Sequence, residues 1–405
     1  MRQGREEVWI TGIGLVSSLG EGADVHWQKL GRPIAPEPVV DHERFAPYTV
    51  HPLADIDFAH QIPRTSDQRQ MERWQRIGVY SAGLALADAN IAGDQELLER
   101  TDLCIAAGNG ERDLALDSRI LAGSGAEGPT GAYLNQQLAT GLRPTLYLGQ
   151  LSNLLAGNIS IVHKATGSSR TFKGEEMAGV SAVADAVHRI EAGQGEVFLV
   201  GGALNAERED ALLGSELAGA LCSGPYRPVW KRRDQGGGLV LGSLGAFLVL
   251  EARGHAHARG AVPYARLSTV LSDRSRRRPG EASAAAARLF SRLPLDPDTP
   301  NIGILSGASG AEPATAEELQ FLAGIERRGF NPQVRAWGSL LGHSLEAHFV
   351  AGLALAALAM SNDAFYPPFG TSEVETPSNL RVDRILVTAF GHWRGEALAL
   401  VQSAW

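Results

Sequence analysis

The side chains of this sequence that could perform covalent chemistry are few. A thiolate is a good nucleophile for thioester exchange. The two cysteines, Cys104 and Cys222, lie far apart and form neither a metal-ligand pair nor a disulfide framework. Cys104 lies in an apolar strand-like run, which is typical of a small core residue. Cys222 lies in a loop-like setting with no flanking histidine or base, so we expect a structural role for it as well.

Two acids and one histidine stand at the predicted starts of helices. Glu175 and Glu176 precede apolar residues at helical spacing, and a helix N-terminus favours anions there. Glu176 has two readings: a polar anchor with a function, or an ordinary first-turn acid. His343 follows Gly342 at the start of a second, strongly apolar helix. A hydrogen-bonded core histidine is the preferred interpretation there.

A basic segment and a glycine run complete the candidates. Arg274, Arg276, Arg277 and Arg278 lie in the polar stretch 273–280, which we expect to be an exposed loop. They could dock an acidic protein, although a solvated loop is the simpler interpretation. The run 236–238 is Gly-Gly-Gly, but no lysine-serine pair follows it, which excludes a phosphate-binding loop.

The elements that must position these residues recur in the two halves of the chain. Each half has a short apolar strand, then a helix rich in small residues, then two further strands. In the first half we expect strands at 101–108, 196–202 and 245–251 around a helix at about 176–192. In the second half we expect strands at 301–307, 383–391 and 396–401 around a helix at about 343–360. This repetition predicts two related α/β halves.

The join between the halves falls near 253–262, where the apolar pattern breaks. We therefore predict an N-terminal half at 1–255 and a C-terminal half at 256–405. The segment from Asp113 to Gly149 fits no simple period. We interpret it as an inserted lid or interface element.

Composition excludes several classes of function. The chain has 405 residues, 44% of them hydrophobic, and a formal net charge of −8. This charge argues against a nucleic-acid groove or an anionic membrane as a partner. The longest apolar run, 349–360, is too short to cross a bilayer, and residues 1–7 are polar. We expect a cytoplasmic protein.

Several motifs, in order along nearly the whole chain, resemble the β-ketoacyl synthases of the elongating type. The opening run from Val8 to Gly20 resembles their first strand and turn. Lys164-Ala-Thr-Gly167 resembles the lead into their nucleophile strand, and Gly342-His343 resembles the pair that opens their second buried helix. Further matching positions are Asn153, Ala156, Gly157, Ile159, Ser160, 182–186, Gly201, Gly202, Arg227, Pro228, 242–251 and 389–391.

The resemblance implies a thiolase-like fold, with two βαβαβαββ halves in a five-layer αβαβα core. It also implies where catalytic groups would stand. The family condenses acyl groups with a cysteine nucleophile, two histidines and a lysine, which hold the acyl chain and stabilise the enolate and oxyanion. On this pattern the nucleophile position is Glu176, the first histidine position is Gly307 and the lysine position is Gly338. Only the second histidine persists, as His343.

A glutamate does not replace the cysteine simply, because an acyl anhydride would be hydrolytically fragile. We therefore expect no independent condensing activity. Relatives with such losses are the chain length factors, which pair with an intact ketosynthase in type II polyketide systems and limit the depth of a shared tunnel. In these the nucleophile position commonly carries glutamine, so Glu176 is a departure. The resemblance makes residues in or near 113–149 candidate tunnel walls.

Two alternatives stay open at this point. A decarboxylase of malonyl carrier protein could use Glu176 and His343, as loading-type ketosynthases with glutamine do. A purely structural partner could stabilise the ketosynthase without setting chain length. Under the leading hypothesis the partners are the ketosynthase, in a heterodimer, and an acyl carrier protein. We expect no metal and no directly bound cofactor, since the phosphopantetheine arm of the carrier would enter through the ketosynthase.

Overall fold

The computed structural model describes residues 6–125, 128, 130–370, 372–378 and 381–405. Its main sheet has eleven strands, and the order of ten of them is a repeat. The first half contributes, from the edge inward, β5 (Ser169–Phe172), β4 (Asp102–Ala106), β6 (Val197–Leu204), β8 (Leu244–Ala252) and β1 (Val8–Ser17). The second half contributes β11 (Asn331–Ala336), β10 (Asn301–Ser306), β12 (Arg384–Phe390), β13 (Glu396–Gln402) and β9 (Ala265–Asp273).

The direction of pairing repeats as well. In each half the first two pairings are parallel and the next two are antiparallel. The halves join where Val8–Ile10 of β1 pairs antiparallel with residues 265–267 of β9. The sheet order therefore agrees with the two related α/β halves expected from the sequence.

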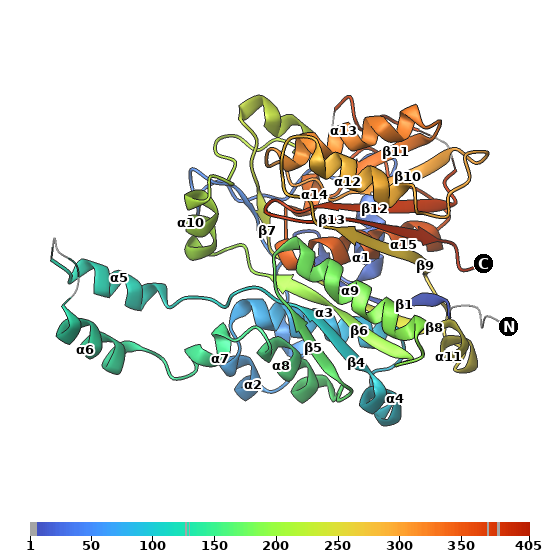
Figure 1. Cartoon of the computed structure of the whole chain (residues 1–405). Coiled ribbons are helices and arrows are strands. Elements are labelled where there is room, and N and C mark those ends of the chain that lie inside the picture. Colours follow the sequence, from blue (N-terminus) through green and yellow to red (C-terminus); the bar gives the residue numbers. More distant parts are fainter. Residues whose placement is uncertain (1–5, 126–127, 129, 371, 379–380) are drawn as a thin grey trace.

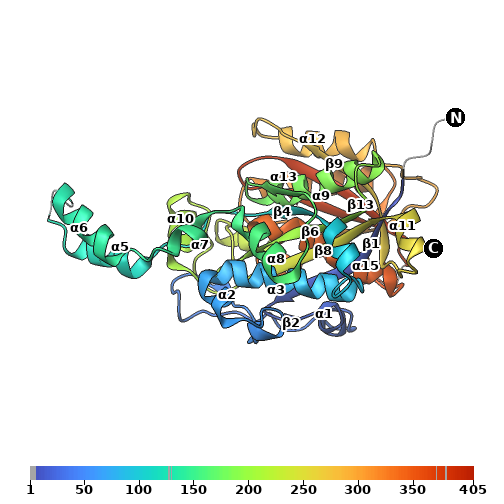
Figure 2. The ribbon, with the colours of Figure 1, turned by 90° about the horizontal axis from the view of Figure 1, so that it is seen from below.

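Helices pack between the two halves of the sheet and on its outer faces, which gives a layered structure (Figures 1 and 2). Helices α9 (Glu176–Glu191) and α15 (His348–Ser361) contact each other between the two parts of the sheet. Helices α3 (Arg73–Asp88) and α8 (Leu154–His163) cover one outer face, and α12 (Glu281–Phe290) and α13 (Ala314–Arg327) cover the other. The result is the five-layer arrangement that the resemblance implied.

The smaller elements connect these layers. They are β2 (Gly20–Glu21), β3 (Val50–His51), β7 (Leu241–Gly242), α1 (Ala23–Leu30), α2 (Thr65–Gln70), α4 (Gln95–Arg100), α7 (Leu146–Gln150), α10 (Glu209–Leu217), α11 (Arg253–Ala258), α14 (Gly338–Leu341) and the 3-10 turns η1 (Phe58–His60), η2 (Val229–Gln235) and η3 (Leu345–Ala347).

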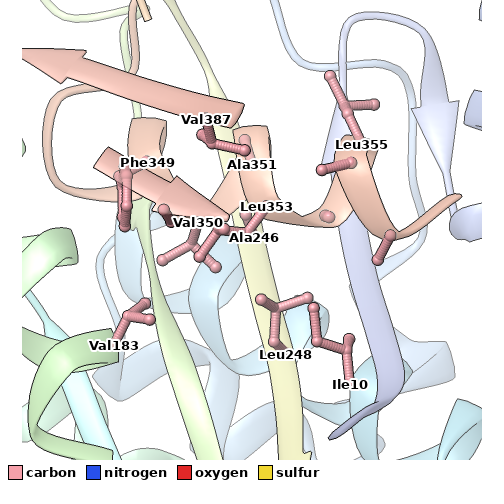
Figure 3. Packing of buried hydrophobic residues seen from close by; sticks show 14 of the residues in the cluster. Ile10, Val183, Ala246, Leu248, Phe349, Val350, Ala351, Leu353, Leu355 and Val387 are labelled. Atoms are coloured by element: carbon pink, nitrogen blue, oxygen red, sulfur yellow. The ribbon is translucent and has the colours of Figure 1, made fainter. Parts of the chain in front are cut away.

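The middle of the core is formed by α15, which is apolar nearly all round. Figure 3 shows Phe349 and Val350 of this helix near Val183 of α9 and Ala246 of β8. These side chains are all buried. A helix without a polar face is stable only when it is covered on every side, and here the two parts of the sheet and α9 cover it.

The second central helix begins later than the sequence predicts. We expected a helix from 343, but α15 begins at His348. Gly342 and Leu345 both have left-handed backbone conformations, with φ of 72° and 43°, which interrupt the helix before residue 348. His343 therefore lies before the helix, where it forms an isolated parallel bridge with Leu241.

The segment 113–149 contains regular structure, contrary to its lack of period. Helix α5 (Leu114–Ala122) and helix α6 (Gly131–Gly141) contact each other and form an arm that extends away from the body in both views (Figures 1 and 2). Arg143 links the base of the arm to the body through an ion pair with Glu72.

Membrane insertion finds no support in the helices that the structure describes, because none of them is both long and apolar enough to cross a bilayer.

Candidate functional site

Glu176 is the first residue of the central helix α9, where the helix dipole favours a carboxylate. Its side chain is buried, with 4% of the residue exposed. The preceding residue, Glu175, has φ 51° and ψ −133°, a strained conformation for a side chain other than glycine. Such strain is typical of turns that fix a functional residue at the head of a helix.

The carboxylate of Glu176 binds the retained histidine. The distance from His343 Nε2 to Glu176 Oε1 is 2.9 Å, and both side chains are almost completely buried. The backbone N–H of His392 donates to the same oxygen at 3.1 Å. Burial alone would raise the pKa of Glu176, but the hydrogen bond and charge of His343, with backbone donors, hold this pKa below its ordinary value. The structure thus joins two predicted site residues as a buried pair.

The other two predicted positions do not contribute side chains. Gly307 directly follows β10, and its N–H donates to Thr388 Oγ1 at 3.1 Å. A Cβ at Gly307 would lie only 2.5 Å from the carbonyl oxygen of Thr388. Gly338 begins α14, and a Cβ there would be 3.3 Å from Ala308 O and 3.8 Å from His348 Cε1. Neither glycine therefore has room for a larger side chain unless its neighbours shift.

Two residues that the sequence analysis did not single out lie beside this centre. The ring centroids of His348 and His343 are 4.3 Å apart, and those of His348 and Trp337 are 4.7 Å apart. Burial, together with the charge of His343, places the pKa of His348 well below its ordinary value, so its imidazole is neutral. A lone histidine between Ala347 and Phe349 in an apolar run was the signal that could have revealed it.

Two further buried acids, Glu346 and Glu318, have pKa values shifted in the opposite direction to that of Glu176. The Glu346 carboxylate fills the space beside Gly108, where a Cβ would be 2.5 Å from Oε1. Burial, reinforced by the charges of Glu176 and Glu175, raises the pKa of Glu346 to about 7. Burial also raises the pKa of Glu318 to about 7, although Ser306 and Thr388 donate hydrogen bonds to it. Sequence reasoning missed both acids, because each lies in an ordinary helical or turn pattern.

The cysteines lie outside this centre. Cys104 is fully buried in β4, and its Sγ lies 3.5 Å from Asp185 Oδ2. Burial and the charge of Asp185 raise the pKa of this thiol to about 12, so it is not a thiolate at neutral pH. Cys222 is also buried. Both observations agree with the expected structural roles.

Within the described ranges, no group of three or more histidine, cysteine, aspartate or glutamate side chains is placed so that it could hold a metal ion.

The arrangement brings a carboxylate and an imidazole together as a buried hydrogen-bonded pair. His343 Nε2 is bound to Glu176, so it does not offer this nitrogen to an enolate oxygen. With glycines at 307 and 338, the centre also lacks the two side chains that would complete enolate stabilisation. The geometry therefore describes a buried acid–histidine pair at the position where the resemblance places a nucleophile.

Comparison with known proteins identifies the relatives of this architecture. The family model described as beta-ketoacyl synthase, N-terminal domain, matches residues 5–256. This chain belongs to the beta-ketoacyl synthase family. The chain is 25% identical over 391 residues to the oxytetracycline polyketide beta-ketoacyl synthase 1 of Streptomyces rimosus, which covers 92% of this chain and 89% of the relative.

A second relative of the beta-ketoacyl synthase family matches a shorter part. The 3-oxoacyl-[acyl-carrier-protein] synthase 2 of Vibrio harveyi is 27% identical over 272 residues, which is 65% of this chain but only 62% of that protein's length. Among solved structures, the ishigamide ketosynthase/chain length factor superposes with a TM-score of 0.78 at 21% identity, covering 99% of this chain and 100% of the other. That likeness confirms the expected thiolase-like ketosynthase fold.

Proposed function

We propose that this chain is a non-condensing subunit, similar to a chain length factor, that pairs with an active ketosynthase in type II polyketide biosynthesis. One observation carries the proposal. At the position that the resemblance assigns to the nucleophile stands Glu176, whose Oε1 is bound to His343 Nε2 at 2.9 Å in a buried pair. A carboxylate so held is neither a thiolate nor free to accept an acyl group.

Two surface features support a partner chain. Strand β5 lies at one edge of the sheet, and such an edge pairs readily with another strand. The arm and the segment after it expose large apolar side chains, which monomeric proteins rarely gather on one surface. These are Leu121, Leu138, Tyr147, Leu148 and Leu151.

The arm itself also favours a partner. Its two helices have 9 and 11 residues, and isolated helices of this length are marginal in water. Packing against a second chain would stabilise them. The proposed partner is a ketosynthase with an intact cysteine, and the acyl carrier protein would deliver its phosphopantetheine arm to that subunit.

The test is co-expression of this chain with a candidate ketosynthase from the same gene neighbourhood, followed by native mass spectrometry and product analysis. We expect a one-to-one complex that makes products of one defined length. If this chain stays separate from the ketosynthase and leaves its products unchanged, the proposal is wrong.

A substitution in the arm separates a length-setting role from a purely structural one. Ala115→Phe enlarges an exposed small residue of α5, and Ala258→Phe makes the same change on α11, far from the arm. A length-setting subunit predicts shorter products from the first variant and unchanged products from the second. Unchanged products from both, with the complex intact, would leave only a structural partner.

The decarboxylase alternative has its own assay. Incubation of this chain with malonyl carrier protein should yield no acetyl carrier protein above the buffer background, because His343 Nε2 is committed to Glu176. Acetyl product that disappears in His343→Ala would favour the decarboxylase.

A further inference from the structure

The sequence predicted that the whole arginine segment, residues 273–280, is an exposed loop, but its four arginines are not equally exposed. Arg274, Arg276 and Arg278 are exposed, but Arg277 turns inward with a left-handed backbone, φ 61°. Its Nη2 donates to the carbonyl oxygens of Gly391 and Gly395, the second at 3.1 Å. Only 18% of its side chain is exposed. This arginine is therefore a structural contact, and the prediction of a solvated loop is wrong for it.

The segment that Arg277 holds, residues 391–395, connects β12 to β13. A glycine stands at each end, and the N–H of Gly391 donates to the carbonyl of Gly395 at 3.1 Å, which closes the loop. Gly395 has φ 80°, a conformation that favours glycine. Glycine allows more backbone conformations than other residues, and this segment has one at each end. Contacts from outside the segment are therefore needed to fix its position.

The same segment lies against the head of α9 at three points. The N–H of His392 donates to Glu176 Oε1, and Arg394 Nη2 donates to Glu175 Oε2 at 3.1 Å. Gly395 packs on Met177, where a Cβ would come within 2.5 Å of the side chain. The segment therefore covers the Glu176 end of the pair and contributes to the burial of that carboxylate.

The guanidinium of Arg277 suits this role. Its Nη2 donates to both carbonyl oxygens, while Nη1 of the same planar group points toward β13, and a lysine ammonium has only one nitrogen to place in these two positions. Arg277 Nη1 also lies 3.5 Å from Glu396 Oε1, a fully buried carboxylate that accepts two further hydrogen bonds from Ser275. The inward arginine is thus held by β13 at the same time as it holds the loop that precedes β13.

We propose that Arg277 is a positioning residue that locks segment 391–395 over the Glu176–His343 pair and so excludes carrier-borne acyl groups from this centre. The inference goes beyond the proposed pairing with a ketosynthase. It concerns only contacts within this chain, so it is tested without a partner.

The experiment introduces a cysteine at position 176, beneath segment 391–395. In Glu176→Cys the new cysteine reports access to the centre, and its alkylation by iodoacetamide is followed by peptide mass spectrometry on the full chain. We expect slow alkylation. Adding Arg277→Ala should accelerate it by about tenfold or more, the effect expected when one or two hydrogen bonds that close the segment are lost.

A matched control and a conservative variant sharpen the test. Arg276→Ala removes an exposed charge one residue away and should leave the alkylation rate of Glu176→Cys unchanged. Arg277→Lys keeps the charge but offers one nitrogen in place of Nη1 and Nη2, so it cannot face Glu396 and the two carbonyl oxygens together and should also accelerate alkylation. If neither Arg277 variant accelerates it, or if Glu176→Cys alone reacts as fast as in urea, the proposal is wrong.

The native cysteines distinguish local opening from general loosening. Cys104 and Cys222 are buried elsewhere in the same molecule. Their alkylation should stay slow when Arg277 is replaced. If their rates rise in parallel with that of the reporter, Arg277 acts on global stability and the lock does not exist. Because no ketosynthase is present, these outcomes are independent of the pairing experiment.

Discussion

Two buried glutamates near the heads of the two central helices behave in opposite ways. Glu176 begins α9, and Glu346 lies in the turn just before α15. Both are about equally buried, yet the pKa of Glu176 is lowered and that of Glu346 is raised to about 7. The difference lies in the partners: Glu176 has His343 and the N–H of His392, whereas Glu346 faces two other acids. Burial sets the cost of a charge, and the partners decide whether the charge persists.

The largest test of this comparison removes the partner of Glu176. His343→Ala removes the side chain that pairs with the buried Glu176 carboxylate and leaves the N–H of His392 in place, and we expect a loss of about 3 to 5 kcal/mol in the free energy of unfolding. Urea denaturation measures it. Adding Glu176→Gln should recover a large part of the loss, because the uncompensated charge is gone.

A control accompanies this cycle. His257→Ala removes an exposed histidine on α11 and should change stability by less than about 0.5 kcal/mol. If the double variant His343→Ala with Glu176→Gln is no more stable than His343→Ala, the charge of Glu176 is not what the histidine compensates.

The second test concerns the pH dependence of Glu346. Its pKa is raised from 4.5 to about 7 on folding, so the folded protein keeps a proton here that the unfolded chain releases. The resulting stability is full below the unfolded pKa and is lost as the pH rises through about 7. Glu346→Gln should therefore be near neutral at pH 5 and stabilising at pH 8, on the order of 1 to 3 kcal/mol.

Thermal or urea unfolding across this pH range checks the prediction for Glu346. Glu318, whose pKa is also about 7, remains in the variant and should leave part of the pH dependence in place. The exposed Glu326→Gln serves as the matched control and should show an equal effect at both pH values. A wild-type stability that does not fall between pH 5 and 8 would contradict the assignment.

The smallest expected effect comes from the neighbouring acid, Glu175. Glu175→Gln removes the same charge as Glu176→Gln, but Glu175 is 35% exposed and pairs with Arg394, itself 43% exposed. Exposed pairs contribute about 0 to 1 kcal/mol, so we expect a change of this size or less. Urea unfolding of both variants should rank Glu176→Gln as the larger change, and the reverse order would refute the role given to burial.

The fold could be predicted from the sequence because it follows from local pattern. Buried strands read as apolar runs, and the run at 196–202 became β6 (Val197–Leu204) within two residues. The helix expected from Glu176 begins there. The start of α15 was missed because the left-handed backbone at Leu345 is imposed by packing, since leucine has no preference for it.

The candidate site was accessible in part. Glu176, His343, Gly307 and Gly338 were named from their order along the chain, and the first two lie in contact. Their functional roles stay predictions. His348 was not found, and Arg277 was named only as part of an exposed basic loop. The surroundings of both depend on segments far away in sequence: Trp337 packs on His348, and residues 391–395 accept hydrogen bonds from Arg277. No local spacing carries such information.

The alanine content of α15 has a consequence for where a long substrate could be accommodated. Small, fully buried side chains bring this helix close to its neighbours, as the packing of Gly352 against Trp337 and Val387 illustrates. The space around α15 at the centre of the subunit is thus already filled by closely packed backbone and small side chains. We therefore expect a carbon chain that grows by successive units to lie at the interface of two polypeptides. Both subunits together would then determine its length.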